Sequence, residues 1–276
     1  MFADFLAFLK SEMEVPTQFG WFHIMFLVIT VAYSAFLVWR YRDASDKKMR
    51  LIAFVMWIVL VLLEAYKQFV YSFSYADGLL QFDYQWYAFP FQFCSAILYA
   101  LPFVVFLKDG KIRDAFMGFL ASFSLFAGLA VMLYPGDVFI HMTGINIQTM
   151  VHHGWQVAFG IFMVAYNRKK FSWKFFARGI LVFVGFLAVA MILNELVHSY
   201  FASNAIEEDF NMFYISPYYD CTLPLLKDIY KMVPYAAFLA IYIFGFALVA
   251  AIVVAAEKAV VCLSTKANKK KALQEV

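Results

Sequence analysis

The sequence predicts an all-α polytopic membrane protein, a helical bundle with seven transmembrane helices. Its 276 residues are 64% hydrophobic and only 15% charged, whereas an ordinary soluble domain carries about 25% charged residues. Apolar runs of about 20 residues, the length at which a helix crosses a bilayer, recur along the whole chain. The 34 Phe and 17 Tyr residues suit a lipid-facing surface with aromatic belts at both interfaces.

The apolar segments divide the chain into three predicted parts. Residues 1–18 form a surface part, residues 19–257 form the seven-helix transmembrane domain, and residues 258–276 form a basic cytoplasmic tail. The boundaries follow long apolar runs that are separated by short charged connections. The transmembrane helices are predicted at residues 19–39, 51–71, 86–107, 115–134, 147–166, 175–197 and 235–255.

The surface part is predicted to be an amphipathic helix over residues 2–14. Phe2, Phe5 and Leu9 recur there at helical spacing. The segment lacks the early basic region of a secretory signal peptide, and Lys10 interrupts its apolar run. We therefore expect the helix to lie on the membrane surface.

Basic residues in the connections predict the orientation in the membrane. Eighteen of the 22 Lys and Arg residues follow the first, third, fifth or seventh predicted span. Because short basic connections remain in the cytoplasm, this side is predicted to be cytoplasmic and the N-terminus to be outside. The opposite connections are acidic and contain Asp77, Asp83, Asp137 and the run 207–209. The basic residues behind the net charge of +3 thus lie in short clusters that indicate membrane topology. No nucleic-acid partner is expected.

Polar side chains recur in four predicted spans at a similar depth. At 1.5 Å per residue, they fall within about 12 Å of the outer interface. Polar groups in hydrocarbon are costly, usually face the interior of the bundle and often mark a function. The set comprises Glu64, Lys67, Cys94, His152, His153, Gln156, Asn194, Glu195 and His198.

Cys94 and the two adjacent histidines form the candidate catalytic group. A thiol becomes a nucleophile when a base takes its proton, and that base is usually a histidine oriented by a carboxylate or an amide. Adjacent helical residues point about 100° apart, so one of His152 and His153 is expected to enter the site. The candidates for the orienting group are Glu64, Asn194 and Glu195.

The same residues can also have purely structural roles. Glu64 and Lys67 lie three residues apart on one helix face and suit an internal ion pair. Glu195 and His198 are near a span end, where water can hydrate them. A cysteine is also a common small apolar residue in protein interiors.

The chain resembles a known family at two short motifs, Phe89-Pro90-Phe91-Gln92-Phe93-Cys94-Ser95 and His153-Gly154. It is similar there to the YwaF-like bacterial integral membrane proteins and to the related transmembrane protein 164 family of animals. The resemblance extends to residues 211–215 and 231–235, before the last predicted span, and covers nearly the whole chain. It implies a seven-span membrane protein, expected in a bacterial plasma membrane.

The resemblance also implies a chemistry, because the animal relatives are described as Cys/His lipid acyltransferases. They move a fatty acyl group between glycerophospholipids through a thioester. By position, Cys94 is the implied nucleophile and His153 the implied base, with His152 as the second choice. Gln92, two residues before the cysteine, is counted with the supporting or substrate-binding residues. Bacterial relatives often have a Leu-rich segment where this chain has Phe91-Gln92-Phe93, so the resemblance leaves the contacts around the cysteine open.

Three functions remain open, and an enzyme is only one of them. The first is a lipid acyltransferase whose partners are membrane lipids. The second is a transporter or small-ligand-binding protein that uses Glu64, Lys67, His153 and Glu195. The third is a structural membrane protein whose polar core fixes helix packing. No nucleotide loop, zinc-binding helix or haem-attachment motif occurs, so no cofactor or metal is expected.

Overall fold

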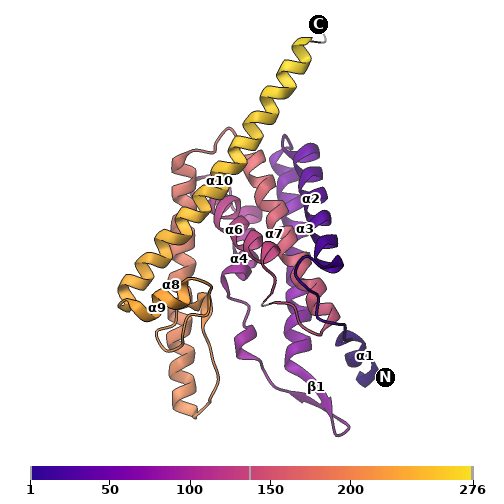
Figure 1. The fold of residues 1–276 in the computed structure, drawn as a ribbon, viewed down its shortest axis with the longest axis vertical. Coiled ribbons are helices and arrows are strands. Elements are labelled where there is room, and N and C mark those ends of the chain that lie inside the picture. The colour runs from indigo at the N-terminus through magenta and orange to yellow at the C-terminus, as the bar shows by residue number, and fades with distance from the viewer. Residues whose placement is uncertain (1, 137, 275–276) are drawn as a thin grey trace.

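Helices run back and forth between two ends of an elongated bundle in the computed structural model, which describes residues 2–136 and 138–274 (Figure 1). The shorter helices α4 and α6 lie between α8 on one side of the bundle and α2 and α3 on the other (Figure 1). The elements are α1 Phe2–Leu9, α2 Trp21–Tyr41, α3 Asp46–Ser72, β1 Phe73–Ala76, β2 Leu79–Phe82, η1 Trp86–Ala88, η2 Phe93–Ser95, α4 Ala96–Phe106, α5 Lys111–Phe119, η3 Leu120–Ser124, α6 Leu125–Leu133, α7 Thr143–Tyr166, α8 Trp173–Asn204, η4 Met212–Tyr214, α9 Leu226–Met232 and α10 Tyr235–Gln274.

The two ends of the bundle differ in structure. One end, called the hairpin end, holds α1, α9 and the antiparallel hairpin of β1 and β2 (Figure 1). The other, called the basic end, holds the turns at residues 42–45, 107–110 and 167–172. Two of the helices that start at the basic end are capped by serines: Ser45 accepts from the Lys48 amide before α3, and Ser172 accepts from the Phe175 amide before α8.

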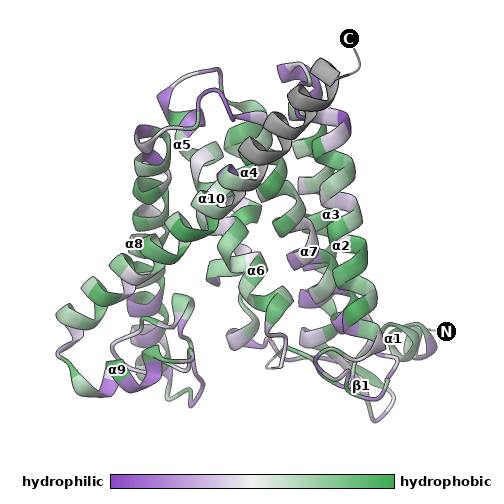
Figure 2. Ribbon diagram, turned by 45° about the horizontal axis from the view of Figure 1, so that its top comes forward, coloured by the Kyte–Doolittle hydropathy of each residue, from purple (hydrophilic) through white to green (hydrophobic). Residues whose placement is uncertain are grey.

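The protein is an integral membrane protein. In the described part of the chain, five helical segments are long and apolar enough to cross a membrane, namely Trp21–Tyr41, Asp46–Ser72, Lys111–Leu133, Trp173–Asn204 and Tyr235–Ala256. Figure 2 shows hydrophobic residues along the middle of these helices and hydrophilic residues nearer their ends. The all-α membrane bundle is therefore confirmed, while the count of seven crossings and the side on which each terminus lies remain predictions.

The third predicted span, residues 86–107, is not one continuous helix. The short helix η1 ends at Ala88, and regular helix resumes only at Phe93, leaving the apolar helix Phe93–Phe106 too short for the usual spanning length. Pro90 explains the break, because it lacks an N–H group and disfavours helical backbone at Phe89. As a result Cys94 lies in the first turn of a helix and not in its middle.

The N-terminal helix is shorter than predicted, since α1 ends at Leu9 and not at residue 14. Beyond it, the Met13 amide donates to the His141 carbonyl at 2.7 Å, and the Thr143 amide donates to the Ser11 carbonyl at 2.9 Å. These bonds hold the chain in an extended form beside the start of α7. At the other terminus, α10 continues as a helix through most of the predicted tail, residues 258–276. The side chains from residue 260 onward are not among those that the structure describes.

Helix α7 occupies the interior of the bundle and packs against α2 and α6. Two glycines allow this close approach. A side chain at Gly154 would collide with the Thr30 hydroxyl of α2, and a Cβ atom at Gly160 would lie 2.5 Å from the Leu125 Cβ atom of α6. The glycine of the His153-Gly154 motif is thus needed for packing, and it brings the histidines into the protein interior.

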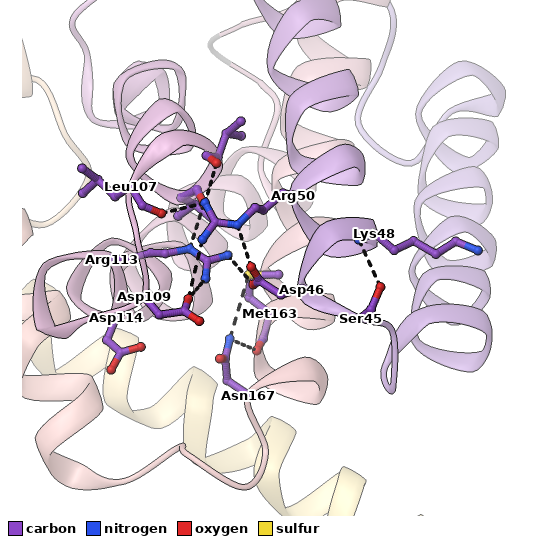
Figure 3. A network of polar contacts seen from close by, with 12 residues as sticks. Ser45, Asp46, Lys48, Arg50, Leu107, Asp109, Arg113, Asp114, Met163 and Asn167 are labelled. Carbon is purple, nitrogen blue, oxygen red and sulfur yellow. Dashed lines mark hydrogen bonds and ion pairs between the residues drawn. The ribbon is translucent and has the colours of Figure 1, made fainter.

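A charge network around the buried Arg113 fastens the helix ends at the basic end (Figure 3). Arg113 is only 2% exposed; it donates to the Val104 carbonyl at 2.9 Å and to Asp46 at 2.6 Å, and it also pairs with Asp109. Arg50 binds Asp46 at 2.6 Å and donates to two carbonyls at the C-terminal end of α4. Arginine donors thereby satisfy carbonyls that a helix end leaves open and join α3, α4 and α5.

Candidate functional site

Cys94 lies in η2, where an extended segment turns into α4. Its neighbour Phe93 packs edge-on against Phe183 and Phe246, which fixes this turn against α8 and α10. Cys94 itself is partly exposed and forms no disulfide. Cys94 lies in the first turn of this helical run, near the positive end of the helix dipole. The amides of Ser95 and Ala96 already donate within the turn, to the Gln92 and Phe93 carbonyls.

Two side chains of α7 bind the backbone carbonyl of Cys94. The His152 Nε2 atom lies 3.2 Å from the carbonyl oxygen, and the Gln156 amide donates to the same oxygen at 3.2 Å. Since a carbonyl only accepts, His152 carries its proton on Nε2 and leaves Nδ1 unprotonated in the neutral ring. The Gln156 amide also donates to the Ser124 hydroxyl at 3.1 Å.

His153 has its ring orientation fixed from the other side. Its Nδ1 atom lies 2.7 Å from the Thr149 carbonyl, so Nδ1 carries the proton and Nε2 is left with a free lone pair. The rings of His152 and His153 are tilted neighbours, with centroids 5.1 Å apart. Both residues are buried, although they point in different directions from α7.

The site contains an unusual concentration of unpartnered acceptors. Four buried side-chain N or O atoms in the described part of the chain lack a hydrogen-bond partner, and three of them belong to His152, His153 and Gln156. Buried polar groups are normally paired, because an unmade hydrogen bond costs about 1–3 kcal/mol. Three such atoms lie within five residues of α7, and each of them can accept a hydrogen bond.

Glu64 and Lys67 form an ion pair, with Nζ and Oε1 2.8 Å apart. Gln68 donates to the same Glu64 oxygen at 2.8 Å and to the Ala88 carbonyl at 2.7 Å. Gln68 therefore ties α3 and its ion pair to the end of η1, which precedes the Cys94 segment. This agrees with the structural interpretation of the pair, and it leaves Glu64 engaged by two donors.

Gln92 and Asn194 bind a loop segment instead of facing Cys94. The Gln92 amide donates to the Asn211 carbonyl at 3.0 Å and accepts from the Phe213 amide at 2.9 Å. Asn194 pairs in the same two-point manner with the backbone of Met212, at 3.1 and 2.7 Å. These contacts hold Phe213 at a φ of 59°, a left-handed conformation that is costly for a bulky residue.

Glu195 and His198 lie on α8 beside the loop before α9. The Tyr218 hydroxyl donates to Glu195 at 2.6 Å, and this hydrogen bond raises the pKa of Tyr218. The His198 ring stacks on Tyr218 with centroids 3.5 Å apart. Within the described residues, no hydrogen bond or ion pair connects Glu195 or His198 with the Cys94 carbonyl or with His153.

Ser124 is a site neighbour that the sequence interpretation missed. It ends η3, a π-helical turn between α5 and α6, and π-turns occur often at functional sites. The available signal was a pair of hydroxyl residues, Ser122 and Ser124, in an otherwise apolar span. Among the described residues, no group of three His, Cys, Asp or Glu side chains could hold a metal ion.

Comparison with known proteins identifies the family. The family model of the TMEM164 family matches residues 18–256, nearly the whole chain. The protein therefore belongs to the TMEM164 family, which confirms the resemblance to transmembrane protein 164 proteins, while the narrower bacterial YwaF-like grouping remains a prediction. No curated protein and no solved structure was found to match the chain.

Proposed function

We propose that this protein is a lipid acyltransferase in which Cys94 carries a fatty acyl group as a thioester. The observation that carries the proposal is the contact between α7 and the Cys94 residue, beside a second histidine that has a free, oriented nitrogen. A nucleophile next to a base, with the base oriented by a third group, is the arrangement used in covalent catalysis. Here the Thr149 carbonyl orients His153.

His153 is the base that we assign to Cys94. Its Nδ1–H bond to Thr149 fixes the tautomer in which Nε2 accepts a proton. The position of Cys94 in the first turn of a helical run adds a second supporting feature. Backbone N–H groups and the helix dipole at such a turn stabilise a thiolate and the oxyanion of a tetrahedral intermediate.

The proposed reaction has two steps. The Cys94 S–H proton moves to Nε2 of His153, and the sulfur attacks the ester carbonyl carbon of a phospholipid. The carbon–oxygen bond breaks, the imidazolium protonates the departing glycerol oxygen, and a lysophospholipid leaves. In the second step the hydroxyl of another lysophospholipid gives its proton to Nε2 and attacks the thioester carbon, and the thiolate leaves and regains that proton.

The membrane setting supports a lipid substrate. Cys94 and His153 belong to a bundle whose helices are apolar enough to cross a membrane. Lipid chains therefore surround the protein. We place it in the plasma membrane of a bacterium, with the hairpin end outside. A transporter or ligand binder that uses Glu64, Lys67 and Glu195 has less support, because Glu64 is engaged by two donors and Glu195 by Tyr218.

The test is a thioester assay by intact-protein mass measurement. Purified protein is incubated in micelles with dioleoyl phosphatidylcholine, and hydroxylamine then releases any thioester. Wild type is expected to gain one oleoyl group, and Cys94→Ala none. Cys221→Ala is the matched control, since burial raises the pKa of the Cys221 thiol and keeps it protonated. Wild-type protein that never gains the acyl group contradicts the proposal.

A further inference from the structure

We propose that the two adjacent histidines have different roles, which rests on the proposed function. His152, together with Gln156, is a positioning residue that holds the Cys94 carbonyl, whereas His153 alone exchanges the proton with the thiol. The observation behind this division is that the two rings use opposite nitrogens. His152 donates through Nε2 to Cys94, and His153 donates through Nδ1 to Thr149 on its own helix.

The Cys94 carbonyl is the point at which α7 controls the nucleophile. Two donors, from His152 and Gln156, meet its oxygen at 3.2 Å each. Binding a carbonyl from two directions fixes the plane of its peptide group, and with it the direction of the Cα–Cβ bond that carries the sulfur. In a lipid environment no bulk water replaces a lost donor, so the orientation depends on these two side chains.

Gln156 extends this control to a third helical segment. The same amide nitrogen that donates to Cys94 donates to Ser124, at the end of the π-helical turn η3. Gln156 is fully buried, and its position on α7 is set by the close packing of α6, since a Cβ atom at Gly128 would lie 3.1 Å from the Gln156 Cβ atom. The amide is therefore held between η3 and η2 and cannot easily follow a displaced cysteine.

Positioning of this kind has a measurable size. A displacement of about 1 Å at a reacting atom lowers the rate by about 100-fold. Loss of a general base lowers it by about 100- to 10,000-fold. The two roles therefore overlap in the size of their effect, and a simple alanine substitution does not separate them.

Amide side chains separate the roles, because the amide nitrogen of Gln lies near the position of histidine Nε2 and that of Asn near Nδ1. His152→Gln keeps a donor for the Cys94 carbonyl, whereas His152→Asn loses it. His153→Asn keeps the donor to Thr149 and removes the free nitrogen; His153→Gln removes both. The readout is the rate of oleoyl thioester formation on Cys94 in micelles with dioleoyl phosphatidylcholine.

We expect His152→Gln to form the thioester about tenfold faster than His152→Asn, because only a donor is required at that position. Both His153→Asn and His153→Gln are expected to slow it at least about 100-fold, since neither amide accepts a proton. The pH profile of the rate gives a second readout. His152→Gln should keep the wild-type profile, because the group that exchanges the proton is unchanged.

Gln156 is tested by a matched pair of variants. Gln156→Met has a similar shape and removes both donated bonds, whereas Ser124→Ala removes only the bond to Ser124. We expect Gln156→Met to lower kcat about 10- to 100-fold with little change in KM, and Ser124→Ala to lower it much less. If Gln156 has only a structural role, both variants should lose thermal stability, and the folded fraction of each should keep the kcat of the wild type.

Three outcomes overturn the inference in distinguishable ways. If His152→Gln abolishes the thioester and His153→Asn retains it, the roles are reversed, while the proposed function stands. If His152→Gln and His152→Asn form the thioester at the same rate, the donor to the Cys94 carbonyl does not matter. If wild-type protein never carries the acyl group, the proposed function fails and the division of roles fails with it.

Discussion

The basic end of the bundle and the α7 histidine cluster both bury polar groups, but they use them differently. At the basic end, Arg113 and Arg50 direct their donors to Asp46, Asp109 and helix-end carbonyls (Figure 3). On α7, His152, His153 and Gln156 each use one polar atom and leave the other unpartnered. The first network has the pattern of groups that hold helices together, and the unpartnered atoms of the second support the proton exchange that we propose for it.

A third histidine, His23, shows the same difference between satisfied and unpartnered polar groups, here among residues of one type. His23 of α2 is fully buried, accepts from the Phe19 amide at 2.9 Å and donates to the Met132 carbonyl at 2.8 Å. Both of its nitrogens are satisfied by backbone groups. His23 therefore has the pattern of a structural histidine, which His152 and His153 lack.

Substitution of Arg113 should give the largest loss of stability. Arg113→Met leaves Asp46, Asp109 and the Val104 carbonyl without their shared donor. A buried carbonyl left unpaired costs about 1–3 kcal/mol. The ion pairs with the half-exposed Asp46 and the exposed Asp109 add about 0–1 kcal/mol each, so we expect a clear drop in unfolding temperature in micelles. The folded fraction should still form the Cys94 thioester. Unchanged stability would mean that the basic end does not hold the helices.

Substitution of His23 should have an intermediate effect. His23→Phe keeps a ring in the α2 interior but leaves one backbone N–H and one carbonyl unpaired. The expected cost is about 1–3 kcal/mol of unfolding free energy, measured by chemical denaturation, with thioester formation retained. Loss of the thioester in the folded variant would remove the distinction between satisfied and unsatisfied histidines.

Substitution of His153 should change stability least. His153→Asn keeps the bond to Thr149 and removes an atom that has no partner. We expect less than about 1 kcal/mol of change in unfolding free energy, because no made hydrogen bond is lost. Thioester formation should nevertheless fall by at least about 100-fold. A large loss of stability would place His153 with the structural groups.

The sequence predicted the membrane helices well because long apolar runs leave few alternatives. The break before Cys94 was visible in principle at Pro90 but was hidden by the continuous apolar composition of residues 86–107. The partners of Gln92 and Asn194 were not predictable, since an amide in a span gives no indication of which distant backbone it binds. The Asn211 carbonyl that Gln92 binds is 119 residues away in the chain.

The hydrogen bonds of the two histidines were likewise not predictable from the sequence. Sequence spacing shows that His152 and His153 point in different directions, but not which nitrogen of each ring is engaged. The structure brings His152 to the carbonyl of Cys94 and turns His153 toward Thr149. That information changes an open choice between two bases into a testable assignment.

The most direct test of the central claim is the mass of the wild-type protein after incubation with dioleoyl phosphatidylcholine. We predict one oleoyl group on Cys94, removable by hydroxylamine, absent in Cys94→Ala and strongly reduced in His153→Asn. Folded wild-type protein that carries no acyl group, together with no exchange of acyl chains between added lipids, would contradict the claim that the unpartnered α7 cluster serves a nucleophilic cysteine.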